Sequence, residues 1–270
     1  MSVITISRGS FSRGKEVAEK VAQELGYKCI SREILLETSE DFNIPEIKLV
    51  RAIHDAPSVL ERFTHGKEKY IAYIQATLLG HLKKDNCVYH GLAGHFFVQD
   101  IPHVFKVRVY ADIDYRVEEE MKRENISAEE ARNILKKDDF ERRRWGLQLY
   151  GQDTWDPTLY DLVVHIKTKT VDDVVKIVLH AAKLDCFQTT PESQKRMNDL
   201  SLAADVKAAL VDSFPSVGTS ADDGVVLVKV EAPIIHEEQV TQKIESLAGK
   251  VKGVKEVRVH VTPFTLYSTR

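Results

Sequence analysis

The sequence has few cysteines, and none of them stands near another. The three, Cys29, Cys87 and Cys186, are spread over 270 residues. Cysteines that bind metals come in closely spaced sets, and disulfide-stabilised domains carry many cysteines in a short chain. The spacing therefore favours neither a cysteine metal site nor a disulfide scaffold, and a reducing, cytoplasmic setting is expected.

Long hydrophobic runs and an excess of one charge are also missing. No apolar run approaches the roughly 20 residues of a membrane-spanning helix, and the first predicted strand starts so early that no signal peptide is expected. Lysine and arginine number 38 against 41 aspartate and glutamate, which gives a net charge of −3. Neither nucleic-acid binding nor membrane contact is therefore expected. With 43% hydrophobic and 29% charged residues, the composition is that of an ordinary globular protein.

Residues 3–25 carry the most information. Val3–Ser7 is a β-branched, apolar run that predicts a buried strand, and Val17, Val21 and Leu25 recur at helical spacing. Between them, four residues separate two glycines, and a lysine follows the second. That spacing is typical of a phosphate-binding loop, although a tight glycine turn between a strand and a helix would look the same. The predicted phosphate-binding residues of the loop are Gly9, Ser10, Phe11, Ser12, Arg13, Gly14, Lys15 and Glu16.

The chemistry of phosphate binding explains this spacing. Phosphate oxygens need several backbone N–H groups at close range, and glycines leave room for that approach. The positive end of the following helix and the charge on Lys15 add attraction. Arg13, inside the loop, either contacts phosphate or points to solvent. Glu16 stands where the usual motif has the Ser or Thr that holds Mg²⁺, so it either turns away and caps the helix or ligates the ion itself.

Strands and helices alternate over residues 1–184. This order predicts an α/β fold with a parallel sheet, whose ligands bind beyond the carboxyl ends of the strands, where the loop lies. The polar residues 185–196 predict a linker. Beyond it, residues 197–270 predict a small α+β domain, with a turn at Asp223-Gly224. The expected strands are 3–7, 27–30, 87–90, 104–110, 162–166, 225–230 and 254–261, and the expected helices are 16–25, 32–39, 67–84, 113–149, 171–184, 202–210 and 240–247.

Two separated signatures resemble the cytidylate kinase-like family, a branch of the P-loop nucleoside monophosphate kinases. The first is ITISRGSFSRGKEVAEKVAQELGY at residues 4–27. The second is Asp139-x-x-Arg142-x-x-Trp145, followed by Tyr-Gly at 150–151, Trp155-Asp156-Pro157 and Tyr160-Asp161. The resemblance spans about residues 1–184. It implies a five-stranded parallel sheet with helices on both faces, a nucleotide-binding insert at about 31–84 and a mobile lid at about 123–150. It also implies transfer of the γ-phosphoryl group of ATP, with Mg²⁺, to a nucleoside monophosphate such as CMP.

The resemblance also assigns a catalytic set. Arg142 matches the lid arginine that clamps phosphates, and it would act with Lys15 and Asp139. Asp139 lies one turn from Arg142 and either orients it or forms a plain surface pair. Arg143 and Arg144 adjoin Arg142, and three consecutive residues cannot share one helix face. At most two of these arginines are therefore expected to point into a cleft.

Further positions are assigned less directly. Arg116, after the fourth strand, would bind the nucleotide, and the alternative is an arginine on a helix surface. Ser31 and Arg32 stand where family members place polar residues near the acceptor, although Ser31 equally caps a helix. Besides Glu16, two positions depart from the family pattern. Leu92 follows the glycine where relatives often have an arginine, and His90 ends the third strand where no aspartate is present, a position at which a lone histidine is more often structural.

The tail resembles a BON domain over about residues 197–262. The matching features are Ala-Ala-Leu at 208–210, Gly224–Leu227 and Val251–Val257. Such domains are associated with phospholipid or small-ligand binding, so a ligand or protein partner is expected at the C-terminal domain. No cluster of lysine and arginine in the tail supports membrane contact independently.

Three functional hypotheses follow. The first is an ATP-dependent nucleoside monophosphate kinase that needs Mg²⁺. The second is a nucleotide-binding sensor, catalytically weak or inactive, whose C-terminal domain binds a ligand or partner; Glu16 and Leu92 favour it. The third is a kinase for a small molecule other than a nucleotide. The contacts that would distinguish these acceptors come from the insert, where the resemblance is thinnest.

Overall fold

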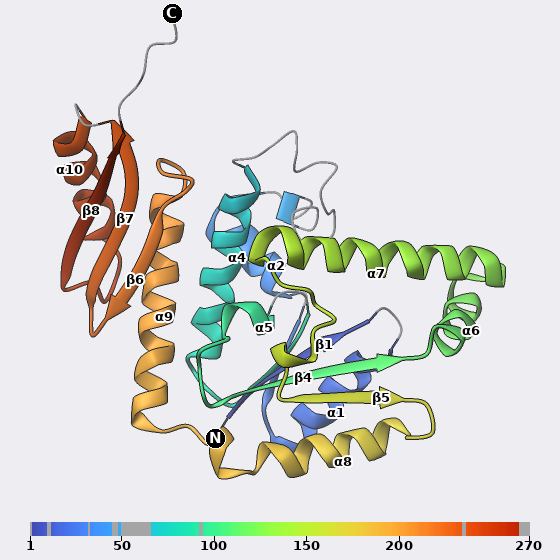
Figure 1. Cartoon of the computed structure of the whole chain (residues 1–270). Coiled ribbons are helices and arrows are strands. Elements are labelled where there is room, and N and C mark those ends of the chain that lie inside the picture. Colours follow the sequence, from blue (N-terminus) through green and yellow to red (C-terminus); the bar gives the residue numbers. More distant parts are fainter. Residues whose placement is uncertain are drawn as a thin grey trace, which may run out of the picture.

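The computed structural model describes residues 2–9, 12–31, 33–44, 48–49, 66–91, 94–233 and 236–264. This part of the chain contains a five-stranded sheet in the N-terminal region and a three-stranded sheet in the C-terminal region. A long helix, α9 (Pro191–Leu210), stands between the two sheets (Figure 1). None of the described helices is long and apolar enough to cross a membrane.

The five-stranded sheet is parallel throughout, in the order β2-β3-β1-β4-β5. β1 lies in the centre, where Val3 pairs with Cys87 on one side and with Val104 on the other. The predicted α/β fold with a parallel five-stranded sheet is confirmed. Its strands are β1 (Val3–Arg8), β2 (Lys28–Ile30), β3 (Cys87–His90), β4 (Val104–Ala111) and β5 (Leu162–Ile166), each within one residue of the expected bounds.

Helices cover both faces of this sheet, which explains why its strands are almost continuously hydrophobic. Successive residues of a strand face opposite sides. Ile4 therefore packs in the cluster that contains Val17 and Val174, and Val3 packs in the cluster on the other face. The helices of the first face are α1 (Gly14–Leu25) and α8 (Val171–Ala182), and those of the second are α2 (Glu33–Asp41), α4 (Gly66–Leu82) and α5 (Gly94–Phe97).

The charged stretch expected as one helix over 113–149 is two helices. α6 (Ile113–Glu124) ends at Asn125, whose φ of 54° lies in the left-handed region that asparagine tolerates. α7 (Ala128–Tyr150) then starts with a capping box between Ser127 and Glu130. Because of this break, α7 runs back over the sheet from the carboxyl end of β4 (Figure 1). Residues of the predicted lid are thereby placed near the loop that follows β1.

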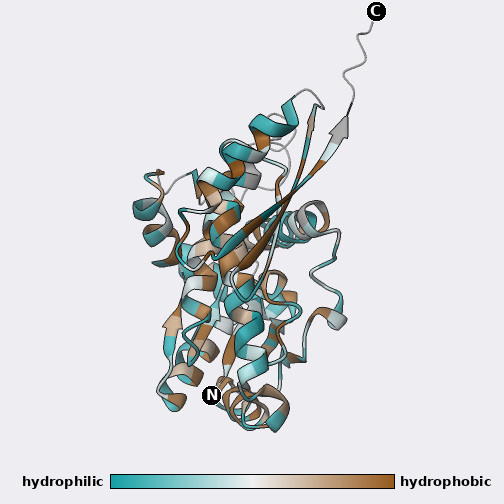
Figure 2. Cartoon of the chain, turned by 90° about the vertical axis from the view of Figure 1, so that its left-hand side faces the viewer, coloured by the Kyte–Doolittle hydropathy of each residue, from teal (hydrophilic) through white to brown (hydrophobic). Residues whose placement is uncertain are grey.

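The C-terminal region forms the second sheet, in the order β6-β7-β8. The turn expected at Asp223-Gly224 joins β6 and β7, with φ of 47° and 85° at the two residues. Hydrophobic and hydrophilic residues follow one another along the strands and helices of this region (Figure 2). The strand β6 was not expected, because Gly-Thr-Ser-Ala-Asp has no hydrophobic alternation. The remaining elements are β6 (Gly218–Asp222), β7 (Val225–Pro233), α10 (Glu237–Ala248) and β8 (Glu256–Phe264).

The expected linker is partly helical, which corrects the prediction for residues 191–196. Thr190 caps α9 and Pro191 occupies its first turn. A Thr-Pro pair is a typical start of a helix, but the polar composition of the residues after it favoured a linker in the sequence. Met197 of α9 is fully buried in the core cluster of the five-stranded sheet, and Val206 of the same helix is fully buried in the core of the small sheet. One helix therefore belongs to both cores.

Polar contacts reinforce the packing of α9 on α4. The Gln194 amide donates to the carbonyl of Lys83 at 2.9 Å, and the Thr189 hydroxyl donates to Asp85 at 2.7 Å. An ion pair joins Lys69 of α4 to Asp212, just beyond α9. The unfolding of the two regions is therefore expected to be coupled.

This coupling predicts the effect of Leu210→Ala. Leu210 of α9 is fully buried in the core of the small sheet, and the cavity left by the shortened side chain should lower the free energy of unfolding by about 2–5 kcal/mol. Both tryptophans of the chain, Trp145 and Trp155, lie in the N-terminal region. Tryptophan fluorescence in a denaturant titration should therefore report the loss, although Leu210 packs in the other core. The exposed Glu192→Ala serves as the control on the same helix. An unchanged tryptophan midpoint in Leu210→Ala would show that the two cores unfold independently.

Candidate functional site

The loop between β1 and α1 is held against β4 by Ser12. This residue is fully buried, and its hydroxyl lies 3.0 Å from the carbonyl of Gly9 and 3.1 Å from that of Val109. Its role in the structure is thus to anchor the loop, whereas the sequence predicted a phosphate contact. Ser10 and Phe11, predicted for the same loop, lie outside the described residues.

The two glycines of the loop stand where other side chains come close. A Cβ on Gly14 would lie 2.6 Å from the Cβ of Arg8, a distance that atoms do not tolerate. A Cβ on Gly9 would lie 3.5 Å from the Cζ of Arg116. The glycines were expected to leave room for phosphate beside the loop backbone. In the structure they also leave room for the side chains of Arg8 and Arg116.

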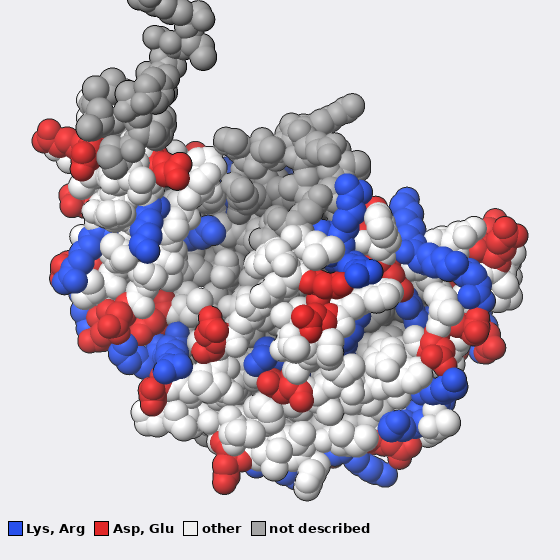
Figure 3. Space-filling view, viewed as in Figure 1, with Lys and Arg blue, Asp and Glu red and all other residues white. Residues whose placement is uncertain are grey.

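A cavity of about 620 Å³ opens beside this loop and under the helices α6 and α7. Its volume is in the range of small-molecule sites. On the face seen in Figure 3, lysine and arginine side chains gather over α7, with acidic side chains among them. The cavity is lined by five cationic residues and four acidic ones, Arg8, Arg13, Lys15, Arg123 and Arg142 with Glu16, Glu19, Glu119 and Asp138.

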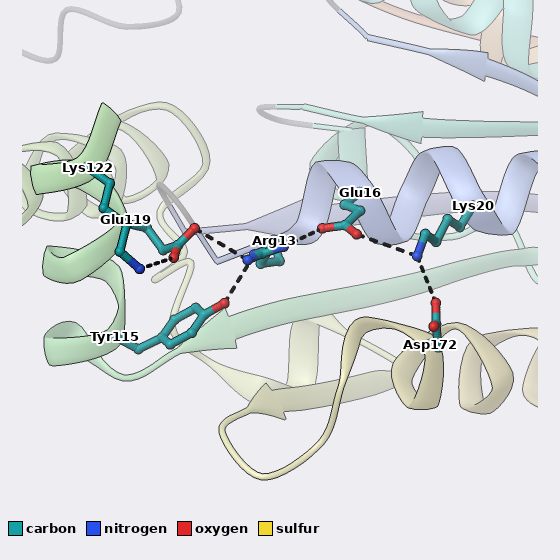
Figure 4. Close-up of polar contacts among 7 residues, drawn as sticks. All are labelled: Arg13, Glu16, Lys20, Tyr115, Glu119, Lys122 and Asp172. Atoms are coloured by element: carbon teal, nitrogen blue, oxygen red, sulfur yellow. Dashed lines mark hydrogen bonds and ion pairs between the residues drawn. The ribbon is translucent and has the colours of Figure 1, made fainter. Parts of the chain in front are cut away.

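Lys15 and Glu16 lie at the start of α1, and both pair with neighbouring side chains. The Lys15 side chain is 63% exposed and lies 3.6 Å from Glu19. Glu16 lies 2.9 Å from Arg13 and 3.5 Å from Lys20 (Figure 4). The Glu16 carboxylate therefore pairs with Arg13 of the loop and with Lys20, one turn further along α1.

Arg13 connects the loop to the helix α6. Its backbone is left-handed, with φ of 60°. Its guanidinium donates to Glu16, to the Tyr115 hydroxyl at 3.1 Å and to Glu119 at 3.4 Å (Figure 4). The hydrogen bond with Glu16 raises the pKa of Arg13. In this structure Arg13 bonds to protein groups and also lines the cavity.

Arg116 and Asp139 form the buried ion pair of the site. Two hydrogen bonds of 2.7 and 2.9 Å run from the guanidinium to the carboxylate, and Arg116 is only 7% exposed. The alternative of a helix-surface arginine is therefore wrong. The role expected for Asp139 also needs correction, because its hydrogen bonds go to Arg116 on α6 and not to Arg142 one turn away. Sequence spacing within one helix could not reveal a pair between two helices.

Arg142 is the one of the three consecutive arginines that lines the cavity. It donates to the backbone carbonyl of Arg8 at 3.3 Å, and burial lowers its pKa. Arg143 instead bonds to Asp153 and lies over the ring of Trp155, and Arg144 lies over the ring of Phe140. This division agrees with the expectation that three consecutive residues cannot share one face.

A smaller cavity of about 30 Å³ lies next to the large one. Two of its lining residues, Thr154 and His95, contact Tyr160, whose hydroxyl donates to the carbonyl of Thr154 at 2.9 Å and lies 3.3 Å from His95. Arg108 donates to the same carbonyl and to the same hydroxyl. This network was not predicted. The Tyr160-Asp161 signature was its only sign in the sequence.

Two histidines near the loop are buried in neutral form. Burial, helped by the charge of Arg108, lowers the pKa of His95 to about 3. Burial and the charge of Arg8 lower that of His90 to about 4. Both rings therefore stay uncharged at neutral pH, which agrees with a structural role for His90.

Ser31, one of the two residues expected near the acceptor, bonds to the helix that follows it. Its backbone N–H and its hydroxyl both donate to the Glu33 carboxylate, at 2.9 and 3.0 Å. The Ser31 hydroxyl was expected to cap the helix or to contact the acceptor, and in this structure its hydrogen bond goes to the Glu33 carboxylate. Arg32 and Leu92 lie outside the described residues.

Arg8 is the residue of this site that the sequence reasoning missed. It ends β1, it lines both cavities, and burial lowers its pKa. The signal was available in its position, because ligands of parallel α/β sheets bind at the carboxyl ends of the strands. The glycine spacing marks a loop that begins only at Gly9, one residue after Arg8.

Comparison with known proteins gives consistent matches. Residues 3–168 match the profile of the cytidylate kinase-like family. The chain is 27% identical over 184 residues to a cytidylate kinase of Archaeoglobus fulgidus, covering 67% of this chain and 94% of that one. It is 26% identical over 179 residues to a cytidylate kinase of Pyrococcus horikoshii, covering 65% and 85%. An uncharacterized protein from Eubacterium ventriosum has a similar fold, with a TM-score of 0.52, 21% identity and coverage of 67% and 98%.

The buried ion pair predicts a large effect of Asp139→Ala on stability. Removing the carboxylate leaves the Arg116 guanidinium buried without its partner, which should cost about 3–5 kcal/mol in a thermal or denaturant titration. Asp114→Ala is a matched control, because Asp114 and Arg132 form an exposed ion pair between the same two helices. It should cost about 1 kcal/mol or less. Equal losses in the two variants would show that the buried pair does not hold α6 to α7.

The buried His95 predicts a dependence of stability on pH. The unfolded chain takes up a proton on this ring below its ordinary pKa of 6.5, and the folded chain does not until about 3. The stability is therefore fully present above about pH 6.5 and is lost as the pH falls toward 3. Between about pH 6.5 and pH 5, His95→Gln should lose about 2 kcal/mol less unfolding free energy than the parent. Parallel pH profiles of the two proteins would contradict this origin.

Proposed function

Because the chain belongs to the cytidylate kinase-like family, we propose that it transfers the γ-phosphoryl group of ATP to a nucleoside monophosphate such as CMP. One observation carries the proposal: the loop that follows β1 lies against a cavity into which half-buried arginines, Arg8 and Arg142, project from the strand and from the overlying helix. Phosphoryl transfer needs little covalent chemistry from a protein. It needs positioned positive charge, which this cavity provides.

The donor phosphates would bind at the loop and the start of α1. Backbone N–H groups at the helix N-terminus attract phosphate, and Ser12 holds the loop in place for them. Arg116, fixed by Asp139 beside Gly9, adds charge on the side of α6. Lys15 lies at the rim, and it would have to leave Glu19 to reach a phosphate.

Mg²⁺ fits this site only in a mode where the substrate supplies most of its ligands. Among the described residues, no three His, Cys, Asp or Glu side chains could hold a metal ion together. Mg²⁺ commonly keeps several waters and takes one or two carboxylates plus substrate phosphates. Glu19 and Asp138 line the cavity and would hold the ion through water. When bound, it would neutralise charge on the transferred group.

Arg142 would act on the transferred group itself. It projects from α7 into the cavity, opposite the loop, and it lines the smaller cavity as well. Its charge counts most while the phosphoryl group is between donor and acceptor, because that group then carries its charge on exposed oxygens. Ser31 and Arg32 remain proposals for the acceptor.

A nucleotide-binding sensor is the second candidate. The exposed, paired Lys15 favours weak catalysis. The helix α9 favours coupling between the nucleotide site and the C-terminal unit, because it packs in the core of the five-stranded sheet and in that of the small sheet. In this reading, nucleotide bound at the loop alters the packing around α4, and the BON-like C-terminal unit binds a ligand or partner in response.

The kinase proposal is tested by incubating the protein with ATP, Mg²⁺ and a panel of nucleoside monophosphates. Transfer to at least one pyrimidine monophosphate is expected. Arg142→Ala should lower kcat by about 100-fold, as for loss of a charge-stabilising donor, with a smaller effect on ATP affinity. Arg144→Ala, on the adjacent residue that covers Phe140, should match the parent. Tight ATP binding without transfer to any monophosphate would reject the kinase and leave the sensor.

A further inference from the structure

We propose that Arg8 is a phosphate ligand at the point where the two substrates of the reaction meet, opposite Arg142. The proposal rests on the proposed function for the identity of the substrates. It adds a residue that neither the loop motif nor the lid signature contains. The ligand chemistry is a phosphate ester or anhydride oxygen, for which the planar guanidinium fork is well suited.

The first argument is position. Arg8 is the last residue of β1, the central strand, and it is aligned with Val109 of β4. It lines the large cavity beside the loop and also the small cavity beside His95 and Trp145. Among the lining residues of the two cavities, Arg8 and Arg142 are the ones they share. A phosphate bound in the large cavity, at its border with the small one, would lie beside both side chains.

The second argument is that the chain holds the Arg8 side chain in place. The side chain packs along Gly14, where a Cβ would lie 2.6 Å from the Arg8 Cβ and 3.0 Å from its Cδ. Gly14 starts α1, so the Arg8 stem runs past the N-terminus of that helix. The guanidinium and the helix N-terminus then present positive charge to the same space. A glycine at position 14 is required as much by this arginine as by a phosphate.

The third argument is unbalanced charge. The Nε of Arg8 is buried and has no hydrogen-bond partner within the described part of the chain. Burial is the largest cause that lowers the pKa of Arg8 and of Arg142. The nearby Asp138 raises the pKa of Arg142 and the charge of Arg8 lowers it, while Glu19 raises the pKa of Arg8, and the net direction is downward for both arginines. Arg116, by contrast, has its own carboxylate in Asp139. Two neighbouring, partly desolvated guanidinium groups are costly unless an anion joins them.

The step itself needs only such an anion-stabilising role. The bond between the γ-phosphorus and the bridging oxygen of ATP breaks, and a bond from the same phosphorus to a phosphate oxygen of the acceptor forms. The departing electron pair stays on the β-phosphate of ADP. The acceptor oxygen is already ionised at neutral pH, so no proton has to move. Arg8 and Arg142 would hold the oxygens of the transferred group from opposite sides.

Two variants separate charge from packing. Arg8→Met keeps the apolar stem and removes the guanidinium, and Arg8→Lys keeps a charge without the fork. Arg144→Met is the control for loss of an arginine near the site. Two properties are measured: the shift of the thermal midpoint with inorganic tripolyphosphate, and kcat and KM with ATP and CMP.

The parent and Arg144→Met should be stabilised by tripolyphosphate, and Arg8→Met should bind it on the order of 10- to 100-fold more weakly. Without ligand, Arg8→Met should be at least as stable as the parent, because a buried charge without a partner is gone. Its kcat should fall by about 100-fold, and Arg8→Lys should regain part of it. Loss of stability in Arg8→Met, with unchanged affinity for tripolyphosphate, would overturn the proposal and make Arg8 a structural residue. So would unchanged kcat in Arg8→Met.

Failure of the proposed function gives a different result. In that case the parent transfers no phosphate to any monophosphate, yet tripolyphosphate still stabilises the parent and not Arg8→Met. Arg8 is then the phosphate ligand of a sensor. If the parent itself is not stabilised by tripolyphosphate, the assignment of Arg8 is rejected whatever the activity.

Discussion

The ion pair between Arg116 and Asp139 is the interaction on which the rest of the site depends. It joins α6 to α7 with two short hydrogen bonds in a place that water barely reaches. A pair of this kind allows little freedom, since loss of either partner leaves a buried charge. It therefore fixes where α7 passes over the sheet. Arg142, one turn beyond Asp139, reaches the cavity only because α7 is held at that position.

The cationic side chains around the loop divide into two groups with different physical roles. Arg13, Arg116 and Lys15 each have a carboxylate partner. Arg8 and Arg142 are partly desolvated neighbours whose shared contact is a backbone carbonyl. Paired charges stabilise the fold and set the geometry, whereas charges without a carboxylate partner have free energy to gain from an incoming anion. The second group is the one that we propose as phosphate ligands.

The helix α9 imposes a second constraint, far from the loop. One side of it completes the core that also contains residues of α4, and the other completes the core of the small sheet. Its buried residues face two different cores, with exposed polar residues such as Glu192 and Arg196 between them, and so they do not form the single apolar stripe by which surface helices are recognised. The helix α4, on which α9 packs, also lies beside α2, the helix that follows the residues proposed for the acceptor.

Local patterns determined much of this protein without any structure. The β-branched runs specify the five strands to within a residue, and the alternation of strands with helices specifies the parallel sheet and the end at which its ligands bind. Glycine spacing located the loop, and helix geometry predicted that Arg142, Arg143 and Arg144 could not all face one cleft. The tertiary structure alone decided which charges meet. Asp139 bonds to Arg116 across 23 positions of sequence, Arg13 to Glu119 across 106, and Arg8 reaches the junction of two cavities. Such contacts depend on how α6 and α7 cross the sheet, and helix crossing is set by packing between elements, about which the residues of a single element carry no information.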